Sequence, residues 1–260
     1  MKNLEGGDHM KLLKSKSKII TLIVVMLILS TLAVSLKVYA KPVNAVLVDY
    51  SNMEQMETNI YMEADAESYL KNQLMEFVTL SEEKVIDIFG NRVSSPYLIV
   101  ALSENALNKY AENLTGQTYY YPWKNYIVIG PKGLNENVIS HEFTHGELRE
   151  RLNHKNKVPV WFDEGLATMV DGRYANNEEV WKENTNNGEN PVDYSALGSH
   201  ESFNNYGTKE AWTNYNLACY EVTRWFKVVG RDGLLKLIDG LNNGKEFDEL
   251  YKLIEGEILN

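Results

Sequence analysis

Apolar side chains recur at helical spacing over much of this 260-residue chain, and short apolar runs interrupt that spacing in its middle third. Over residues 57–89, apolar positions recur every three or four residues between glutamates and lysines, which predicts an amphipathic helix that ends at Gly90. The compact apolar run over residues 97–102 predicts a strand. Ser103 then predicts the N-cap of a short helix over residues 104–113.

Two more apolar runs predict strands, and residues with capping preferences mark the helices that follow. The strands cover residues 118–121 and 126–129. Asn135 predicts the N-cap of a helix that continues to about Leu152. Pro159 stands where a helix can begin, and it predicts a second helix over residues 160–170.

The last third of the chain is predominantly helical in its pattern. Residues 176–190 are polar and rich in Asn, Glu and Gly, which predicts a surface loop or a mobile insertion before the helices resume. Amphipathic helices are predicted over residues 209–229, 234–241 and 247–254. Because the strands precede most of the helices, the order predicts an α+β fold in which a small mixed sheet packs on a mainly helical domain.

The N-terminus has the pattern of an export segment. Four lysines between positions 11 and 18 precede an almost wholly apolar run over residues 19–35, and Val38-Tyr39-Ala40 fits a signal-peptidase site. The length of the run suits either a cleaved signal or a retained anchor in the cytoplasmic membrane. In both cases the remainder is expected outside that membrane. The predicted organisation is residues 1–40 as signal or anchor, 41–95 as an N-terminal helical segment, and 96–260 as the main domain.

The net charge and the cysteine content limit which partners and which disulfide bonds are possible. The net charge of −10 argues against nucleic acid as a partner, because phosphate binding requires a basic surface. The one cysteine, Cys219, permits no intrachain disulfide and is expected to be a small buried hydrophobe in a helix. We expect a monomer.

The sequence His141-Glu142-Phe143-Thr144-His145 lies within the helix predicted after Asn135. Residues four apart share one face of a helix, so both imidazoles can approach one metal ion. Glu164 follows nineteen residues after His145, on the next predicted helix. With 5 histidines in 260 residues, this motif arises by chance in well under about 1% of chains, although a surface helix is the competing interpretation.

Two imidazoles, one carboxylate and an open position form the ligand set of catalytic zinc sites. We therefore predict that Zn²⁺ is bound by His141, His145 and Glu164. Glu142 cannot readily bind the same ion as its neighbour His141. It is better placed to hold the attacking water, to accept its proton as general base and to deliver that proton to a leaving amine.

The other site residues are less strongly marked. A second donor to the developing oxyanion is expected in the C-terminal third, with Tyr215 favoured and Tyr206 or His200 as alternatives. The chain has 16 tyrosines, so packing is the competing role for any one of them. Thr168 and Asp171 lie four and seven residues after Glu164 on the same helical face and are expected to orient ligands, although a solvated helix end is an equal alternative for Asp171.

The H-E-x-x-H motif followed by Trp161-Phe162-Asp163-Glu164-Gly165-Leu166-Ala167 resembles the gluzincin metallopeptidases. More narrowly, residues 97–254 look like the exported peptidase MA-like domains related to the thermolysin and aminopeptidase N groups. The resemblance implies a zincin-type catalytic domain, with the same three zinc ligands and Glu142 as base. It also implies that the strand before the active helix binds the peptide as an added strand, through Tyr126, Ile127, Val128 and Ile129.

One departure from this family bears on activity. The chain has no G-x-M-E-N segment, the element that binds a free substrate N-terminus in aminopeptidases. The predicted catalytic domain over residues 96–260 is therefore expected to be an endopeptidase or a narrow-specificity peptidase that acts on a peptide or protein substrate. Two other functions stay open, namely a non-catalytic exported zinc-binding module and a metal-dependent hydrolase of a non-peptide amide. A structural zinc site would usually have four protein ligands and would leave Glu142 without a purpose.

Overall fold

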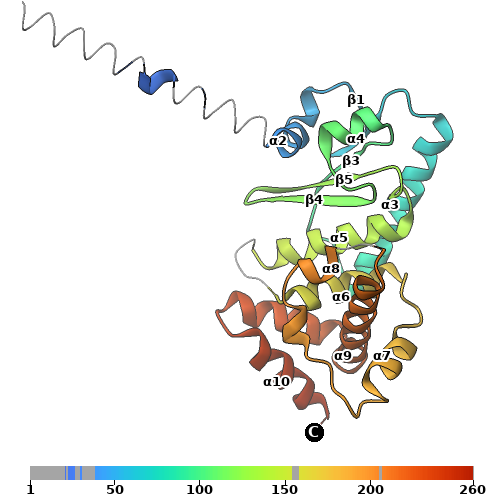
Figure 1. Ribbon diagram of the computed structural model, residues 1–260, viewed down its shortest axis with the longest axis vertical. Helices are drawn as coiled ribbons and strands as arrows, with labels where there is room; N and C mark the ends of the chain where they lie inside the picture. The colour runs from blue at the N-terminus through green and yellow to red at the C-terminus, as the bar shows by residue number, and fades with distance from the viewer. Residues whose placement is uncertain are drawn as a thin grey trace, which may run out of the picture.

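The computed structural model describes residues 39–153, 158–204 and 207–259, together with residues 21, 23–26 and 30. A small sheet lies toward one end of the molecule, and a body of helices forms the rest (Figure 1). The strands are β1 (Met53–Glu57), β2 (Ile60–Glu63), β3 (Tyr97–Val100), β4 (Gly116–Tyr121) and β5 (Lys124–Ile129). The helices are α2 (Ala40–Val46), α3 (Ser68–Phe89), α4 (Glu104–Tyr110), α5 (Glu136–Arg151), α6 (Val160–Asp171), α7 (Asn177–Thr185), α8 (Glu201–Asn204), α9 (Lys209–Asn242) and α10 (Phe247–Leu259).

The sheet is mixed, with five strands in the order β1-β2-β3-β5-β4. β2, β3 and β5 are parallel to one another, whereas β1 and β4 run antiparallel to their neighbours. β5 is apolar from Tyr126 to Ile129, as expected for a strand that is paired on both sides and covered on both faces. Ile127 and Ile129 face the main core, while Tyr126 and Val128 face a smaller core under α2 and α4.

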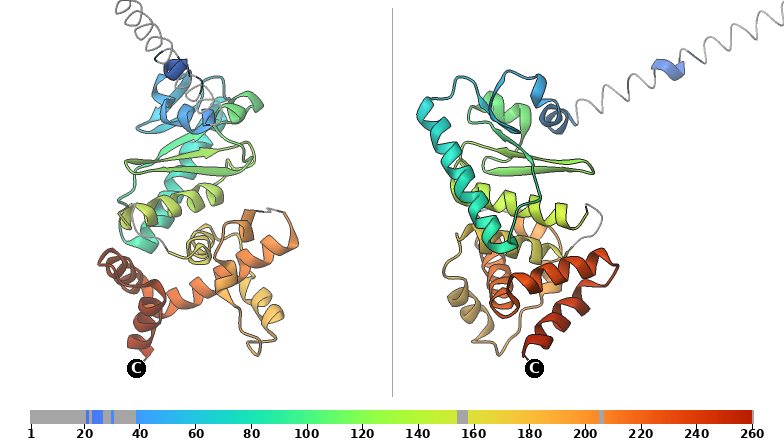
Figure 2. Two further views of the ribbon diagram at one scale, coloured as in Figure 1. Left: turned by 60° about the vertical axis from the view of Figure 1, so that its left-hand side comes forward. Right: turned by 180° about the vertical axis from the view of Figure 1, so that it is seen from behind.

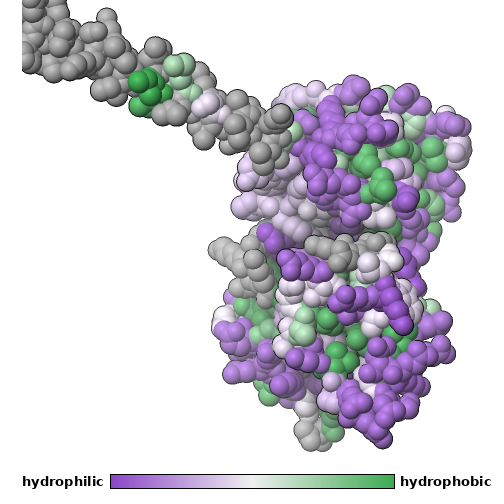
Figure 3. Space-filling view, in the orientation of Figure 1, coloured by the Kyte–Doolittle hydropathy of each residue, from purple (hydrophilic) through white to green (hydrophobic). Residues whose placement is uncertain are grey.

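Layers of helices continue away from the sheet. α5 runs beneath the sheet beside α3, and α6 lies between α5 and α9 (Figures 1 and 2). Large buried side chains such as Phe162 and Trp225 fill the space between α6, α9 and α10. The face drawn in Figure 3 is mostly hydrophilic, as expected when amphipathic helices turn their apolar sides inward. The fold is therefore α+β and mainly helical, as the sequence predicts.

Several predicted elements are confirmed. Ser103 caps α4 by accepting a hydrogen bond from the Ala106 N–H, and Asn135 caps α5 by accepting one from the Val138 N–H. The predicted break at Gly230 is confirmed, because its φ of 64° and ψ of −168° are not helical and α9 therefore consists of two helical segments that meet at a kink. Cys219 is buried, as expected.

The prediction of a helix from residue 57 is wrong for its first eleven residues. Residues 53–63 form a hairpin whose turn includes Asn59 at a positive φ of 65°, and the helix α3 begins only at Ser68. β2 pairs with β3, so Ile60 and Met62 are buried by a long-range contact that helical spacing cannot reveal. Residues 41–95 are therefore not a separate helical segment, because the sheet crosses that boundary.

The polar stretch over residues 176–190 was expected to be a loop, but most of it is the helix α7. α7 packs on α9 through the buried Val180 and through Trp181, whose ring stacks on Tyr220 at 4.5 Å. About one buried side chain per turn is enough to pack this helix on α9. Its other positions can be polar, and this is why its composition resembles that of a loop.

The predicted signal or anchor lies almost wholly outside the described residues. Among those that the structure describes, no helix combines the length and apolarity needed to span a membrane.

Candidate metal centre

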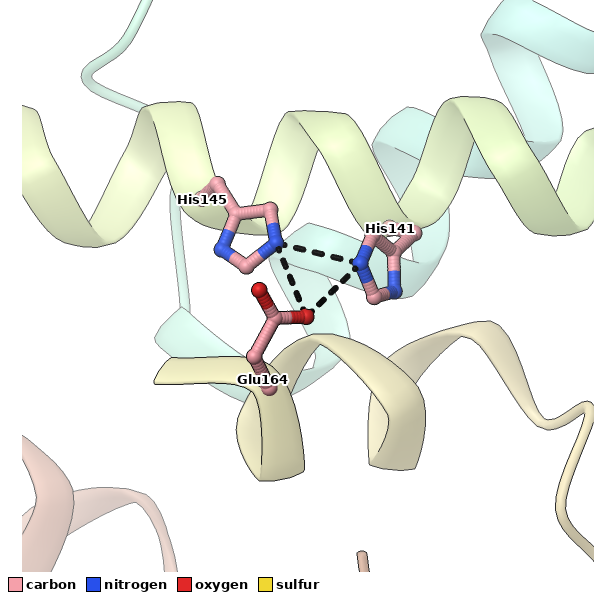
Figure 4. Close-up of side chains that lie close together, drawn as sticks. All are labelled: His141, His145 and Glu164. Carbon is pink, nitrogen blue, oxygen red and sulfur yellow. Dashed lines mark hydrogen bonds and ion pairs between the residues drawn. The ribbon is translucent and has the colours of Figure 1, made fainter. Parts of the chain in front are cut away.

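Three side chains predicted as metal ligands meet between α5 and α6 (Figure 4). The Nε2 atoms of His141 and His145 are 3.1 Å apart. The Oε2 atom of Glu164 lies 3.4 Å from the first and 3.7 Å from the second. Ligands at about 2.0–2.1 Å from a tetrahedral metal ion are separated by about 3.3 Å, so a metal ion with ligands at that distance fits this triangle.

Glu164 Oε2 is buried and has no hydrogen-bond partner among the described residues. Its separations from the two imidazoles are too long for strong hydrogen bonds. A buried carboxylate oxygen without a partner is costly, and native structures leave few of them. A cation at the centre of the triangle would satisfy this atom, so the residues present fit a metal ion.

Each histidine contacts a carboxylate through Nδ1, the ring nitrogen that does not face the triangle. His141 Nδ1 is 2.9 Å from Asp171 Oδ2, and His145 Nδ1 is 2.7 Å from Asp163 Oδ1. An Nδ1–H that donates to a carboxylate leaves Nε2 free as a metal ligand and fixes the ring orientation. Asp171 is only 1% exposed, so it is not a solvated helix end. It lies instead against His141, one of the predicted metal ligands.

Asp163 and Arg173 were not predicted. Asp163 directly precedes the ligand Glu164, and this adjacency is the signal that could have found it. Arg173 donates to Asp171 through its backbone N–H at 2.7 Å and through its guanidinium Nη2 at 2.6 Å. Asp171 is thus shared between an imidazole and a guanidinium, an arrangement that no spacing rule indicates.

Thr168 does not have the predicted role. Its buried hydroxyl donates to the backbone carbonyls of Glu164 and Gly165, so it bonds its own helix and not a ligand side chain. This back-bonding is what a buried Thr commonly does inside a helix when no better acceptor is near.

In the metal-free site, neighbouring carboxylates raise the pKa of both imidazoles, so the two histidines hold protons strongly. Burial lowers the pKa of His145, but the charges of Asp163 and Glu164 outweigh burial and raise that pKa to about 10. Burial likewise lowers the pKa of His141, but its hydrogen bond to Asp171 and its contact with Glu164 shift that pKa upward overall. Burial raises the pKa of Glu164, but the positive charge of His145 and the contact with His141 lower it to about 2. A metal ion must therefore displace protons from these imidazoles.

Glu142 is buried beside the triangle but is not part of it. Its Oε2 accepts a hydrogen bond from the Thr118 hydroxyl on β4. A Cβ at position 116 would overlap Glu142 Oε1, so Gly116 leaves the space that this carboxylate occupies. The base predicted from the motif is therefore positioned by two residues of a neighbouring strand.

The candidate oxyanion donors differ in position. The Tyr215 ring centroid lies 6.5 Å from that of His141, and the ring is stacked on Tyr174. His200 lines a cavity that also contains His145 and Glu164. Tyr206 lies outside the described residues. Tyr215 and His200 thus both remain candidates.

A cavity of about 490 Å³ opens beside two of the three candidate ligands. Its walls combine aliphatic side chains with charged ones. They are formed by Tyr120, His145, Leu148, Arg149, Leu152, Val158, Val160, Asp163, Glu164 and His200.

The predicted substrate strand is wrong in one respect. Tyr126, Ile127, Val128 and Ile129 belong to β5, which is paired with β3 on one side and β4 on the other. A strand whose N–H and C=O groups are already paired on both sides cannot accept a further strand. The edge on this side of the sheet is β4.

No protein-family model matches this sequence, and a search of curated proteins also gives no match. The resemblance to gluzincins therefore rests on the motif, the spacing to Glu164 and the geometry described above.

Proposed function

We propose that this protein is a zinc-dependent hydrolase of peptide bonds. The observation that carries the proposal is a three-residue ligand triangle that borders a cavity, with a second buried carboxylate, Glu142, held outside the triangle. Among the described residues, no other His, Cys, Asp or Glu joins the triangle to close it. A ligand set of three, with space for water and substrate, is typical of catalytic rather than structural zinc.

A bound zinc ion would supply a water of lowered pKa and a Lewis acid for the attacked carbonyl. The chain supplies the proton transfers. Thr118 holds Glu142 Oε2, which leaves Oε1, beside Gly116, to accept a proton from the attacking water and to pass it to the leaving amine. Asp163 and Asp171 keep both histidines in the tautomer that binds metal.

The open edge of β4 supports a peptide as the substrate. Thr115 C=O accepts from the Gly130 N–H, so the odd-numbered residues that follow in β4 are turned toward β5. The backbone groups of Gly116, Thr118 and Tyr120 then point to the free edge. A peptide paired there would run along α5 past Glu142. The strand expected to pair with the substrate is therefore β4 and not β5.

The test compares the full-length chain with Glu142→Gln, which removes the base and keeps the size of the side chain. Both proteins are measured for bound zinc and for cleavage of a mixture of peptides with randomised sequences, read by mass spectrometry. We expect one zinc per chain in both, and a loss of activity of roughly 10²-fold or more in Glu142→Gln.

Cleavage unaffected by Glu142→Gln would refute the assigned base. A zinc-loaded chain that cleaves no peptide would refute the peptidase proposal. Parallel assays on non-peptide amides would then separate the other hydrolase from a non-catalytic zinc module.

We also place the active site outside the cytoplasmic membrane, on the pattern of residues 1–40. Mass spectrometry of the N-terminus of the exported protein decides between a cleaved signal and a retained anchor. A full-length chain found only in the cytoplasm would contradict both.

A further inference from the structure

Arg149 extends the metal-binding face of α5 by one turn. His141, His145 and Arg149 are spaced four residues apart, so they lie along one side of the helix, about 6 Å apart in axial rise. Arg149 lines the same cavity as His145 and Glu164. A group bound by this guanidinium would therefore lie next to the bond that the proposed centre cleaves.

No described residue provides a counter-charge that pairs with Arg149. Its guanidinium lies over the Tyr120 ring at 4.6 Å, but its Nε is buried without a hydrogen-bond partner, and no ion pair to Arg149 is found among the described residues. The other five arginines all bond to an acceptor. Their partners are Glu82 for Arg92, Glu147 for Arg151, Asp171 for Arg173, Glu221 for Arg224 and the Asp87 carbonyl for Arg231.

The two acidic side chains that line the cavity do not form an ion pair with Arg149. Asp163 is bonded to His145, and Glu164 belongs to the ligand triangle. Four aliphatic side chains also line the cavity, namely Leu148, Leu152, Val158 and Val160. The cavity thus combines apolar wall residues, which suit an apolar stem, with a planar cation that prefers a carboxylate bound by two parallel hydrogen bonds.

The geometry points to a cavity that selects a substrate carboxylate beside the scissile bond, with Arg149 as the specificity-determining residue. This inference rests on the proposed peptidase function and names the class of its substrates. The carboxylate comes either from a Glu or Asp side chain or from the free C-terminus of a short leaving fragment. The guanidinium chemistry is the same for both sources.

Tyr120 supports this assignment. It comes from β4, the edge strand proposed for substrate pairing, and its ring holds the guanidinium plane. Gly116 and Thr118 on the same face of β4 approach Glu142, two turns earlier on α5. The base and the guanidinium therefore lie along one line under the strand that would carry the peptide.

The first measurement is a cleavage profile of the full-length zinc-loaded chain on randomised peptides, synthesised both as free acids and as C-terminal amides. We expect Glu or Asp to be enriched roughly tenfold or more at one position beside the cleaved bond, or cleavage near the C-terminus of free acids only. The first pattern identifies a side-chain carboxylate, and the second identifies a terminal one. Either pattern supports the inference.

Arg149→Gln should abolish that preference while zinc content stays at one per chain, and Arg149→Lys should restore part of it, because a point charge replaces the planar fork. The matched control is Arg231→Gln, which removes an arginine that does not line the cavity and should leave the preference and the activity unchanged.

The second measurement does not depend on turnover. Peptides that differ only by Glu or Gln at the selected position, or by acid or amide at the C-terminus, are titrated calorimetrically into Glu142→Gln with and without Arg149→Gln. We expect the carboxylate member to bind at least about tenfold more tightly only when Arg149 is present. Peptides cleaved without any preference for a carboxylate, or a preference that survives Arg149→Gln, would overturn the inference and leave the peptidase proposal standing. Absence of all cleavage would refute the peptidase proposal itself.

Discussion

Asp163 and Asp171 show at the scale of single residues how the histidines are prepared for a metal. Each carboxylate accepts from an Nδ1–H and leaves Nε2 directed at Glu164. Loss of such a partner typically costs 10–100-fold in metal affinity. We expect Asp163→Asn to weaken zinc binding by roughly this factor, measured by competition with a chromophoric chelator. Asp193→Asn, a change at an exposed helix cap, is the control. Equal zinc affinity in Asp163→Asn and the wild type would refute the role.

The pKa values of the site predict how the metal-free protein responds to pH. The pKa of His145 rises from 6.5 to about 10 on folding, so its stabilising contribution is complete below pH 6.5 and is lost as the pH rises through about 10. The pKa of Glu164 falls from 4.5 to about 2, so its contribution is complete above pH 4.5 and is lost as the pH falls through about 2. The pair therefore stabilises the metal-free fold most between pH 4.5 and 6.5.

Denaturant unfolding with a chelator present checks this expectation. The wild type should lose stability between pH 6.5 and 10 relative to His145→Gln, which cannot bind the proton. Zinc should reverse the trend, because metal binding requires neutral imidazoles. Parallel stability curves for the two metal-free proteins would contradict the pKa assigned to His145.

The ligands could be predicted from sequence because helix geometry alone brings His141 and His145 to one side. The contacts of Glu142 with Thr118, and of Arg149 with Tyr120, could not be predicted in the same way. They depend on β4 lying across α5, which is a tertiary arrangement with no local pattern in the sequence.

At the scale of elements, the position of Glu164 depends on how closely α6 approaches α9. A Cβ at Gly165 would lie 2.5 Å from the Ala218 carbonyl oxygen and 2.7 Å from Val222 Cγ2. We expect Gly165→Ala to force the helices apart, to lower the free energy of unfolding by about 1–3 kcal/mol and to weaken zinc binding, because the ligand is the adjacent residue.

The matched control for this change is Gly256→Ala in α10, where the added methyl meets no atom within 4 Å. Helix propensity predicts that it raises the free energy of unfolding by up to about 1 kcal/mol and leaves zinc affinity unchanged. Chemical denaturation measures the stability of both variants, and zinc titration measures their zinc affinity. A Gly165→Ala protein as stable as the wild type would show that α6 and α9 do not constrain the ligand.

The strands show where pattern analysis of elements fails. The apolar runs predict β3 and β5, but β2 falls within the helix predicted over residues 57–89, and no strand is predicted at β1. Met53–Glu57 has no buried side chain to mark it as a strand. The strand order could not be predicted either, because β5 lies between β3 and β4 through its parallel pairing with β3, which is distant in sequence.

At the scale of the whole molecule, residues 41–95 belong to the same folding unit as the metal site. They supply β2 to the sheet and α3, whose buried Leu74, Val78 and Phe89 pack in the main core shared with α5. We expect a chain that begins at residue 96 to lack cooperative unfolding, because it exposes that core. A chain that begins at Tyr39 should unfold cooperatively. Circular dichroism with thermal melting distinguishes them, and a cooperative melt of the shorter chain would contradict the single unit.

The central claim is that His141, His145 and Glu164 share one zinc ion and leave a position open. X-ray absorption at the zinc edge of the full-length chain, loaded with one equivalent of zinc, tests it most directly. We expect only nitrogen and oxygen ligands at about 2.0–2.2 Å, with the outer-shell scattering of two imidazoles. A sulfur ligand at about 2.3 Å, or scattering from fewer than two imidazoles, would contradict the claim.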